Sequence, residues 1–188
     1  MGQPLRAHIT WKEYQQLPDD GIRYEVLEGE IVMTPAPEPK HQTASVNLLF
    51  EMESWRRDGG GGGEGMFFTA PVDVILAFDT IVQPDLVYIR GERAKTLVKK
   101  QIHGAPDLVV EIFRKARAER DRITKLQIYQ RFSIQEYWLV DLDARSVTIL
   151  TLSEDGYEVF ASGTGDTKLG SKVLSGFEIT PAEVFERA

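Results

Sequence analysis

The sequence predicts an α/β fold, organised as one domain over residues 1–188. Three observations support this. A near-continuous apolar strand at 107–113 runs directly into a helical pattern at 117–132, as at the start of an α/β unit. Alternating apolar runs near both ends of the chain predict β-hairpins. The chain is 42% hydrophobic and 27% charged, which is ordinary for a globular domain, and no long linker or internal repeat divides it.

Four helices are predicted from capping residues and from apolar side chains that recur at helical spacing. They cover residues 11–17, 41–57, 117–132 and 181–187. Thr10 and Glu13 match a capping box before the first helix. Thr180 is the expected cap of the last, which begins at Pro181. The apolar positions of the second helix include Val46, Leu49, Phe50 and Trp55.

Nine strands are predicted from short apolar runs bounded by turn residues. They cover residues 23–27, 30–33, 66–69, 72–77, 86–90, 107–113, 137–140, 147–152 and 157–161. The first two form a hairpin around the Glu28-Gly29 turn, and a second hairpin turns at 143–145. Two stretches are predicted to be connections. One is the glycine-rich run at 58–65, which favours neither helix nor strand, and the other is the basic segment 91–106.

Composition excludes several classes of protein. The chain has no cysteine, so disulfides, thiolate metal ligands and a zinc ribbon are excluded. No stretch approaches the roughly 18 consecutive apolar residues of a membrane helix. The N-terminus has no apolar run of the signal-peptide type. We therefore expect no membrane association and a cytoplasmic location.

Two basic segments interrupt an otherwise acidic chain. The formal net charge is -7, which disfavours uniform contact with nucleic acid. Residues 90–100 nevertheless hold five basic side chains against one acidic, and residues 114–125 hold six against two. A local basic patch is compatible with binding a phosphate backbone at a defined place. The alternative is a solvated helix face.

Two charged residues stand where apolar ones are expected. Glu111 interrupts the apolar strand 107–113, where an unpaired carboxylate would be costly to bury. At about 100° per residue, Lys125 falls near the middle of the apolar arc of helix 117–132. The helix is expected to pack back on the strand's sheet, and we expect Glu111 to meet a cation. Lys125 either snorkels past its neighbours or points its ammonium at something buried. The pair is either a packing device or part of an active site.

Asp85 adds a third charged residue to this set. It follows Pro84 at the start of the apolar strand 86–90. Two carboxylates on rigid strands suit Mg²⁺, which keeps several waters and takes other ligands from substrate phosphate. A nearby lysine can lower the pKa of an attacking water or steady a phosphate oxygen. Asp85, Glu111 and Lys125 together suit metal-assisted hydrolysis of a phosphodiester.

The order of Asp85, Glu111 and a lysine resembles the PD-(D/E)xK nuclease pattern. The surrounding sequence resembles the Uma2 restriction endonuclease family (DUF820) over nearly the whole chain. The segments that carry the resemblance are TWKEYQQLPDDGIRYEVLEGEIVMTPAPEPKHQ, APVDVILAFDTIVQPDLVYI, GAPDLVVEI, RDRITKLQIY and EYWLVDLD. It implies a restriction-endonuclease-like core, with a central mixed β-sheet flanked by helices and with N-terminal and C-terminal β-hairpins.

The resemblance also implies a site and an activity. Asp85 and Glu111 would be ligands of Mg²⁺ or Mn²⁺, and Lys125 the catalytic lysine. Glu25 and His41 match family positions that line the same site. The implied activity is a metal-dependent endonuclease that hydrolyses DNA. We expect a homodimer, since cleaving both strands of a duplex usually takes two sites.

Simpler interpretations of these residues remain open. Glu25 could be an exposed strand residue facing Arg23, and His41 a helix-start residue without a special task. Asp73 could be an accessory ligand, whereas Asp107 could cap its strand or face solvent.

One departure from the family pattern leaves a second function open. The usual lysine position, two residues after the second acid, holds Phe113, and the segment 114–117 (RKAR) replaces a small hydroxyl-rich loop. The alternative is therefore a weak or inactive nuclease-fold module that binds nucleic acid or a protein partner.

Overall fold

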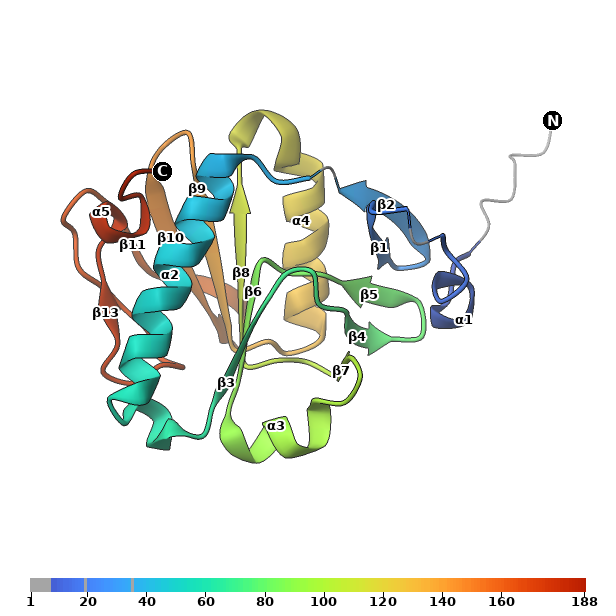
Figure 1. Cartoon of the computed structure of the whole chain (residues 1–188), viewed down its shortest axis with the longest axis horizontal. Helices are drawn as coiled ribbons and strands as arrows, with labels where there is room; N and C mark the ends of the chain where they lie inside the picture. Colours follow the sequence, from blue (N-terminus) through green and yellow to red (C-terminus); the bar gives the residue numbers. More distant parts are fainter. Residues whose placement is uncertain (1–7, 19, 35) are drawn as a thin grey trace.

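A six-stranded mixed sheet forms the centre of the structure, with helices on both faces (Figure 1). The computed structural model describes residues 8–18, 20–34 and 36–188, without the side chains of 62, 63 and 115–121. The strand order is β11-β10-β9-β8-β6-β3, and only β8 and β9 run parallel. The bounds are β3 (Met66–Thr69), β6 (Leu86–Ile89), β8 (Leu108–Phe113), β9 (Glu136–Asp141), β10 (Ser146–Ser153) and β11 (Gly156–Thr164).

Alternating side chains of β8 give the sheet two apolar faces. Leu108, Val110 and Ile112 pack in one cluster with the buried face of α2 (Pro39–Arg57). Val109 belongs to the opposite cluster, with Ile128 and Tyr129 of α4 (Lys115–Arg131). The buried α2 residues are Ala44, Leu48 and Met52. This arrangement confirms the central mixed sheet flanked by helices, and it confirms that α4 packs back on the sheet of the preceding strand.

A second, five-stranded sheet lies beside the first and carries the N-terminal hairpin. Its order is β2-β1-β5-β4-β7. The bounds are β1 (Arg23–Leu27), β2 (Glu30–Thr34), β4 (Val74–Ala77), β5 (Thr80–Val82) and β7 (Ile102–His103). The predicted turn is present, with Glu28 and Gly29 both at positive φ, a conformation that suits glycine. The short helix α1 (Trp11–Tyr14) precedes this sheet and has the predicted capping box.

The C-terminal segment covers the α2 side of the central sheet. β12 (Leu169–Gly170) pairs with β13 (Glu178–Ile179), and α5 (Pro181–Val184) follows with Thr180 as its cap. Asn47 of α2 donates its side-chain amide to the carbonyl oxygens of Val184 and Glu186. The predicted hairpin at 143–145 is also present, joining β9 to β10.

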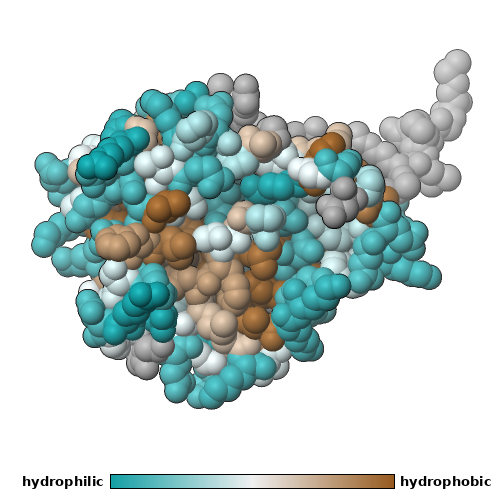
Figure 2. All heavy atoms as spheres, in the orientation of Figure 1, coloured by the Kyte–Doolittle hydropathy of each residue, from teal (hydrophilic) through white to brown (hydrophobic). Residues whose placement is uncertain are grey.

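The predicted helix is present as α2, and its apolar positions do not all face the core. Val46 and Phe50 are 61% and 66% exposed, whereas Leu48 is fully buried. Figure 2 shows hydrophobic residues gathered over α2 on this face of the molecule. The helix carries apolar side chains around much of its circumference, so the sequence could not select the face that is buried.

Both stretches predicted to be connections contain short regular elements. The segment after β6 forms α3 (Gly91–Leu97) and β7, and Gly60–Gly63 form a 3₁₀ turn, η1. Tertiary contacts anchor α3, since its Ala94 is buried and its Arg93 contacts Asp107 and Ala105. Among the helices that the structure describes, none is long and apolar enough to cross a membrane.

Candidate active site

Strand pairing brings the two predicted metal ligands together. β6 and β8 are antiparallel, with Leu86 opposite Val110. Asp85, the residue before β6, therefore lies beside the Glu111-Ile112 end of β8. The backbone N–H of Ile112 donates to Oδ2 of Asp85 at 2.8 Å.

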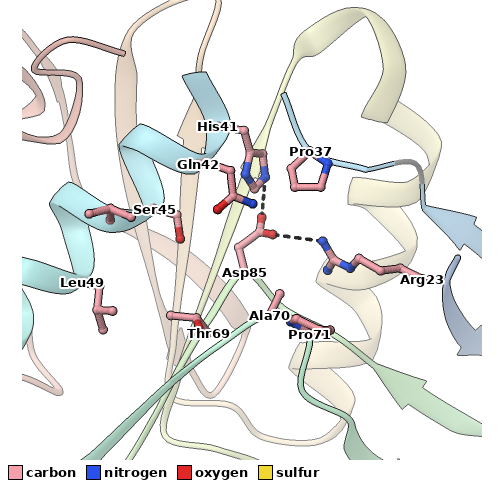
Figure 3. Close-up of a pocket in the computed structure, with 11 residues that line it drawn as sticks. Arg23, Pro37, His41, Gln42, Ser45, Leu49, Thr69, Ala70, Pro71 and Asp85 are labelled. Carbon is pink, nitrogen blue, oxygen red and sulfur yellow. Dashed lines mark hydrogen bonds and ion pairs between the residues drawn. The ribbon is translucent and has the colours of Figure 1, made fainter. Parts of the chain in front are cut away.

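Three groups from different elements hold the carboxylate of Asp85. Besides the Ile112 N–H, His41 in the first turn of α2 places Nε2 3.1 Å from Oδ2. Arg23 of β1 approaches Oδ1 at 3.7 Å (Figure 3). Burial alone would raise the pKa of Asp85, but His41, the Ile112 N–H and Lys125 lower it below its ordinary value. Burial likewise opposes protonation of His41, yet Asp85 raises the pKa of the imidazole. Asp85 is therefore held as a carboxylate.

Lys125 bridges two buried carboxylates. Its Nζ lies 3.0 Å from Oε1 of Glu111 and 2.9 Å from Oε2 of Glu25. The Tyr129 hydroxyl, one turn further along α4, donates to Oε1 of Glu111 at 2.6 Å. Glu111 therefore meets the cation that the sequence predicted. Glu25 is buried, which excludes the alternative that it is an exposed strand residue.

Glu111 is crowded by negative charge. Burial is the main cause that raises the pKa of its carboxyl group to about 7, and Asp85 and Glu25 raise it further. Lys125 and the Tyr129 hydroxyl act in the opposite direction but do not cancel the rise. Burial and the neighbouring Glu111 carboxylate also raise the pKa of Tyr129. An additional cation in this cluster would relieve the crowding.

A network on the second sheet fixes Glu25 and Arg23. The backbone N–H of Gln83 donates to Glu25 at 2.7 Å, and Arg23 donates to the carbonyl oxygen of Gln83 at 2.8 Å. The Gln83 side chain donates in turn to Asp73, which also accepts from the Tyr14 hydroxyl at 2.6 Å. Asp73 therefore supports this network and is separated from the predicted ligand Asp85 by two residues, Gln83 and Arg23.

Two cavities meet at Asp85. The larger, about 310 Å³, is lined by Glu25, Glu111, Lys125 and the His41–Asp85 pair. The smaller, about 260 Å³, shares Arg23, Pro37, His41 and Asp85 with it and extends along α2 (Figure 3). The structure thus brings all five sequence-predicted site residues around one recess.

The donor set fits a hard divalent cation. The charged side chains that line the larger cavity are Arg23, Glu25, Glu38, Asp85, Glu111, Arg114 and Lys125, four acidic and three basic. A phosphate alone would meet these four acidic side chains, and Mg²⁺ or Mn²⁺ would add positive charge beside them. Within the described part of the chain, no group of three or more His, Asp or Glu is placed to hold a metal ion. A cation held by only two side chains, such as Asp85 and Glu111, would complete its shell with water and phosphate.

The two basic segments have different surroundings. Asp107 accepts from the backbone N–H of Arg90 and pairs with Arg93 at 2.7 Å. These contacts place the start of segment 90–100 at the opposite end of β8 from Phe113. Asp107 is buried at the start of its strand and does not face solvent. Arg114 lines the larger cavity and pairs with Glu38 at 3.3 Å. The side chains of 115–117, the rest of the RKAR segment, lie outside the described residues.

The sequence reasoning missed three residues that support the site: Arg23, Gln83 and Tyr129. Tyr129 had a detectable signal, because it lies four residues after Lys125 and so shares its helix face. Arg23 lies two residues before Glu25 on the same strand face. Gln83 contacts Glu25 through its backbone N–H, a contact that leaves no signal in residue type.

Comparisons with known proteins agree with this fold. The family model described as "Uma2: Putative restriction endonuclease" matches residues 11–182. The chain is also similar to a solved structure described as a "putative nuclease belonging to DUF820", from Anabaena variabilis ATCC 29413. The TM-score is 0.76 at 20% identity, over 94% of this chain and 97% of that one, a likeness that concerns the fold. No curated protein matches.

Proposed function

The chain belongs to the Uma2 family, as its motifs predicted, and from that premise we propose a divalent-metal-dependent endonuclease that hydrolyses phosphodiester bonds of DNA. The observation that carries the proposal is the convergence of Asp85, Glu111 and Lys125 in one recess, from three different elements. Glu25 and His41 each contact a member of that set and belong to the proposed site.

Asp85 and Glu111 are the proposed ligands of Mg²⁺ or Mn²⁺. When bound, the cation supplies positive charge for the phosphate oxygens and a coordinated water of lowered pKa. His41 keeps Asp85 ionised, and both His41 and Arg23 contact its carboxylate and orient it. The Tyr129 hydroxyl orients Glu111 from the side of α4.

Lys125 is proposed to stabilise the charge that develops on the phosphate. Its ammonium is fixed between Glu25 and Glu111, so it is already oriented before substrate arrives. The position differs from the usual motif, in which the lysine lies on the strand itself. Here the strand position holds Phe113, and α4 brings Lys125 to the same carboxylate.

Cleavage of supercoiled and linear DNA tests the proposal. Wild type is incubated with Mg²⁺, Mn²⁺ or EDTA beside Glu111→Ala, and folding is checked by circular dichroism. We expect cleavage that needs the metal and falls at least about a hundredfold in the variant, since one catalytic charge interaction is typically worth this much. Cleavage that persists in EDTA, or in the folded variant, would contradict the proposal.

A second function is favoured by Phe113 at the usual lysine position. The chain would then be a nuclease-fold module that binds nucleic acid or a protein partner without cutting. DNA binding that weakens with salt and survives Glu111→Ala, with no cleavage by folded wild type, would favour this function.

The organisation of the chain is part of the proposal. We propose that residues 1–188 form a single PD-(D/E)xK nuclease-like domain that assembles as a homodimer. The exposed Val46 and Phe50 on α2 give an apolar surface available for such an assembly. Light scattering of the purified protein measures the mass directly, and a monomer across the micromolar range would contradict the homodimer.

A further inference from the structure

The larger cavity is lined by Arg23, Arg114 and Lys125, and Arg114 is the most exposed of the three. Lys125 is only 7% exposed and lies within 3.0 Å of two carboxylates. Arg23 is 17% exposed and donates to the carbonyl oxygen of Gln83 at 2.8 Å. Arg114 is 38% exposed, so its side chain lies where solvent reaches the cavity.

The ion pairs of Arg114 are longer than those of Lys125. Its Nη2 lies 3.3 Å from Oε2 of Glu38, and its Nε lies 3.8 Å from Oδ1 of Asp143. Within the described part of the chain, the buried Nε has no hydrogen-bond partner. A guanidinium has five N–H donors in a planar fork that matches two oxygens of a phosphate. Arg114 therefore keeps N–H groups for an anion that enters the cavity.

Glu38 stands at the mouth of the same cavity. It is 48% exposed and lines the cavity together with Arg114. Glu38 directly precedes α2 and Arg114 directly precedes α4, and Figure 1 shows that these helices begin at the same end of the central sheet. An exposed ion pair of this kind contributes little stability, because water screens both charges. A phosphate can therefore replace the Glu38 carboxylate at Arg114 at small cost.

A DNA strand brings more than one phosphate to this cavity. Backbone phosphates lie on the outside of DNA, so one can reach Asp85 and Glu111 while its neighbour along the strand stays at the mouth. Arg114 lies at that mouth. The segment 114–117 also carries three basic residues and no acidic one in the sequence, which favours the approach of a phosphate.

We propose that Arg114 binds the backbone phosphate next to the scissile one, and that Glu38 occupies the guanidinium until DNA displaces it. The inference rests on the proposed function and deepens it, since it names a residue that positions the strand at the same site. It also gives a role to the first residue of the RKAR segment.

Binding of a labelled blunt duplex tests the inference separately from cleavage. Fluorescence anisotropy measures the binding constant at several salt concentrations, with Ca²⁺ in place of Mg²⁺, and circular dichroism checks the folding of each variant. We expect Arg114→Gln to weaken binding about tenfold. The slope of the logarithm of the binding constant against the logarithm of the salt concentration should fall by about 0.9, which corresponds to one lost phosphate contact. Arg114→Lys keeps the charge and should retain most of that slope.

Glu38→Gln should have the opposite effect on binding. It removes the carboxylate that competes with phosphate for Arg114, so the duplex should bind about two- to fivefold more tightly. In the Arg114→Gln background the same change should tighten binding less, because the guanidinium that Glu38 occupies is gone. This comparison carries the test if Arg114→Gln alone binds too weakly for a salt series.

Arg57→Gln is the matched control. Arg57 also pairs with a carboxylate, that of Glu53, but it is the last residue of α2, is 73% exposed and lines neither cavity. This variant should bind the duplex like wild type and keep its salt slope.

Four results would overturn the inference. They are an unchanged salt slope in folded Arg114→Gln, an equal loss of binding in Arg57→Gln, an equal gain from Glu38→Gln in both backgrounds, and no DNA binding by wild type. Metal-dependent cleavage by wild type together with an unchanged slope in Arg114→Gln would overturn the inference and keep the nuclease. Binding that depends on Arg114, without metal-dependent cleavage, would support the inference and contradict the nuclease.

Discussion

At the residue scale, Lys125 and Glu111 account for each other's burial. Each would be costly alone inside the protein, and their 3.0 Å contact offsets part of that cost. Lys125 does not neutralise the cluster, however, because it is shared with Glu25 while Asp85 adds a third carboxylate. A pair that served packing alone would have no need of the additional acids. The excess of carboxylates is therefore the feature that favours a cation site over a purely structural pair.

Glu111→Gln should change how stability depends on pH. Because the folded pKa of Glu111 is raised to about 7 from an ordinary 4.5, the folded state binds more protons than the unfolded state between these values. Wild-type stability should therefore fall as pH rises from about 4.5 through 7. The variant has no such group, so it should gain about 1–3 kcal/mol relative to wild type between pH 5 and pH 8.

Urea unfolding in EDTA at pH 5 and pH 8 measures this difference. Glu92→Gln makes the same change at an exposed position on α3 and should leave the pH dependence unaltered. If the free energy of unfolding changes with pH in the same way for wild type and Glu111→Gln, the pKa of Glu111 is not raised in the folded protein. A loss of several kcal/mol in the variant at pH 8 would instead favour the structural ion pair.

At the element scale, α2 contributes both to the candidate site and to the core, through different residues. Its first turn delivers His41 to Asp85, and its buried face packs on the central sheet. Its apolar residues do not all lie on one face, because Val46 and Phe50 point away from the core. The helix was predictable from the sequence, but its rotation depends on the sheet and the C-terminal segment that it contacts.

Leu48→Ala and Phe50→Ala test that rotation. Leu48 is fully buried, so its truncation should cost about 2–5 kcal/mol through lost packing and a cavity. Phe50 is largely exposed in the single chain, so its truncation should change the stability of the monomer by no more than about 0.5 kcal/mol. Urea unfolding of the two variants measures both. If both variants lose a similar free energy of unfolding, Phe50 is covered in solution.

At the scale of the whole molecule, the site depends on how the two sheets meet. β1 of the five-stranded sheet brings Glu25 and Arg23, while β6 and β8 of the central sheet bring Asp85 and Glu111. Lys125 of α4 joins the two sets, because its ammonium contacts a carboxylate from each sheet. Ligand binding at such a junction should stabilise the fold as a unit.

Mg²⁺ or Mn²⁺ should therefore raise the thermal unfolding midpoint of wild type. At about 100 times the dissociation constant, the ion would add about 2.7 kcal/mol, and EDTA would reverse the shift. Asp85→Asn should lose most of the shift, whereas Glu154→Gln, at an exposed position, should keep it. Scanning calorimetry measures the unfolding midpoint. If the ion raises the midpoint equally in wild type and Asp85→Asn, it binds elsewhere.

Local patterns determined much of this protein. Capping residues, the Glu28-Gly29 turn and the apolar runs predicted the main helices, the hairpins and the central strands, because these features depend on neighbours along the chain. The misplaced charges of Glu111 and Lys125 also indicated the buried cluster, since a charge inside an apolar element needs a partner.

Only the tertiary structure decided the rest. The partners of Glu25 and His41, the roles of Arg23, Gln83 and Tyr129, and the two cavities all arise where segments far apart in sequence meet. The same holds for α3 and for the exposed face of α2. Their physical cause is the packing of the sheets and helices against one another, and no local periodicity records which surfaces that packing brings into contact.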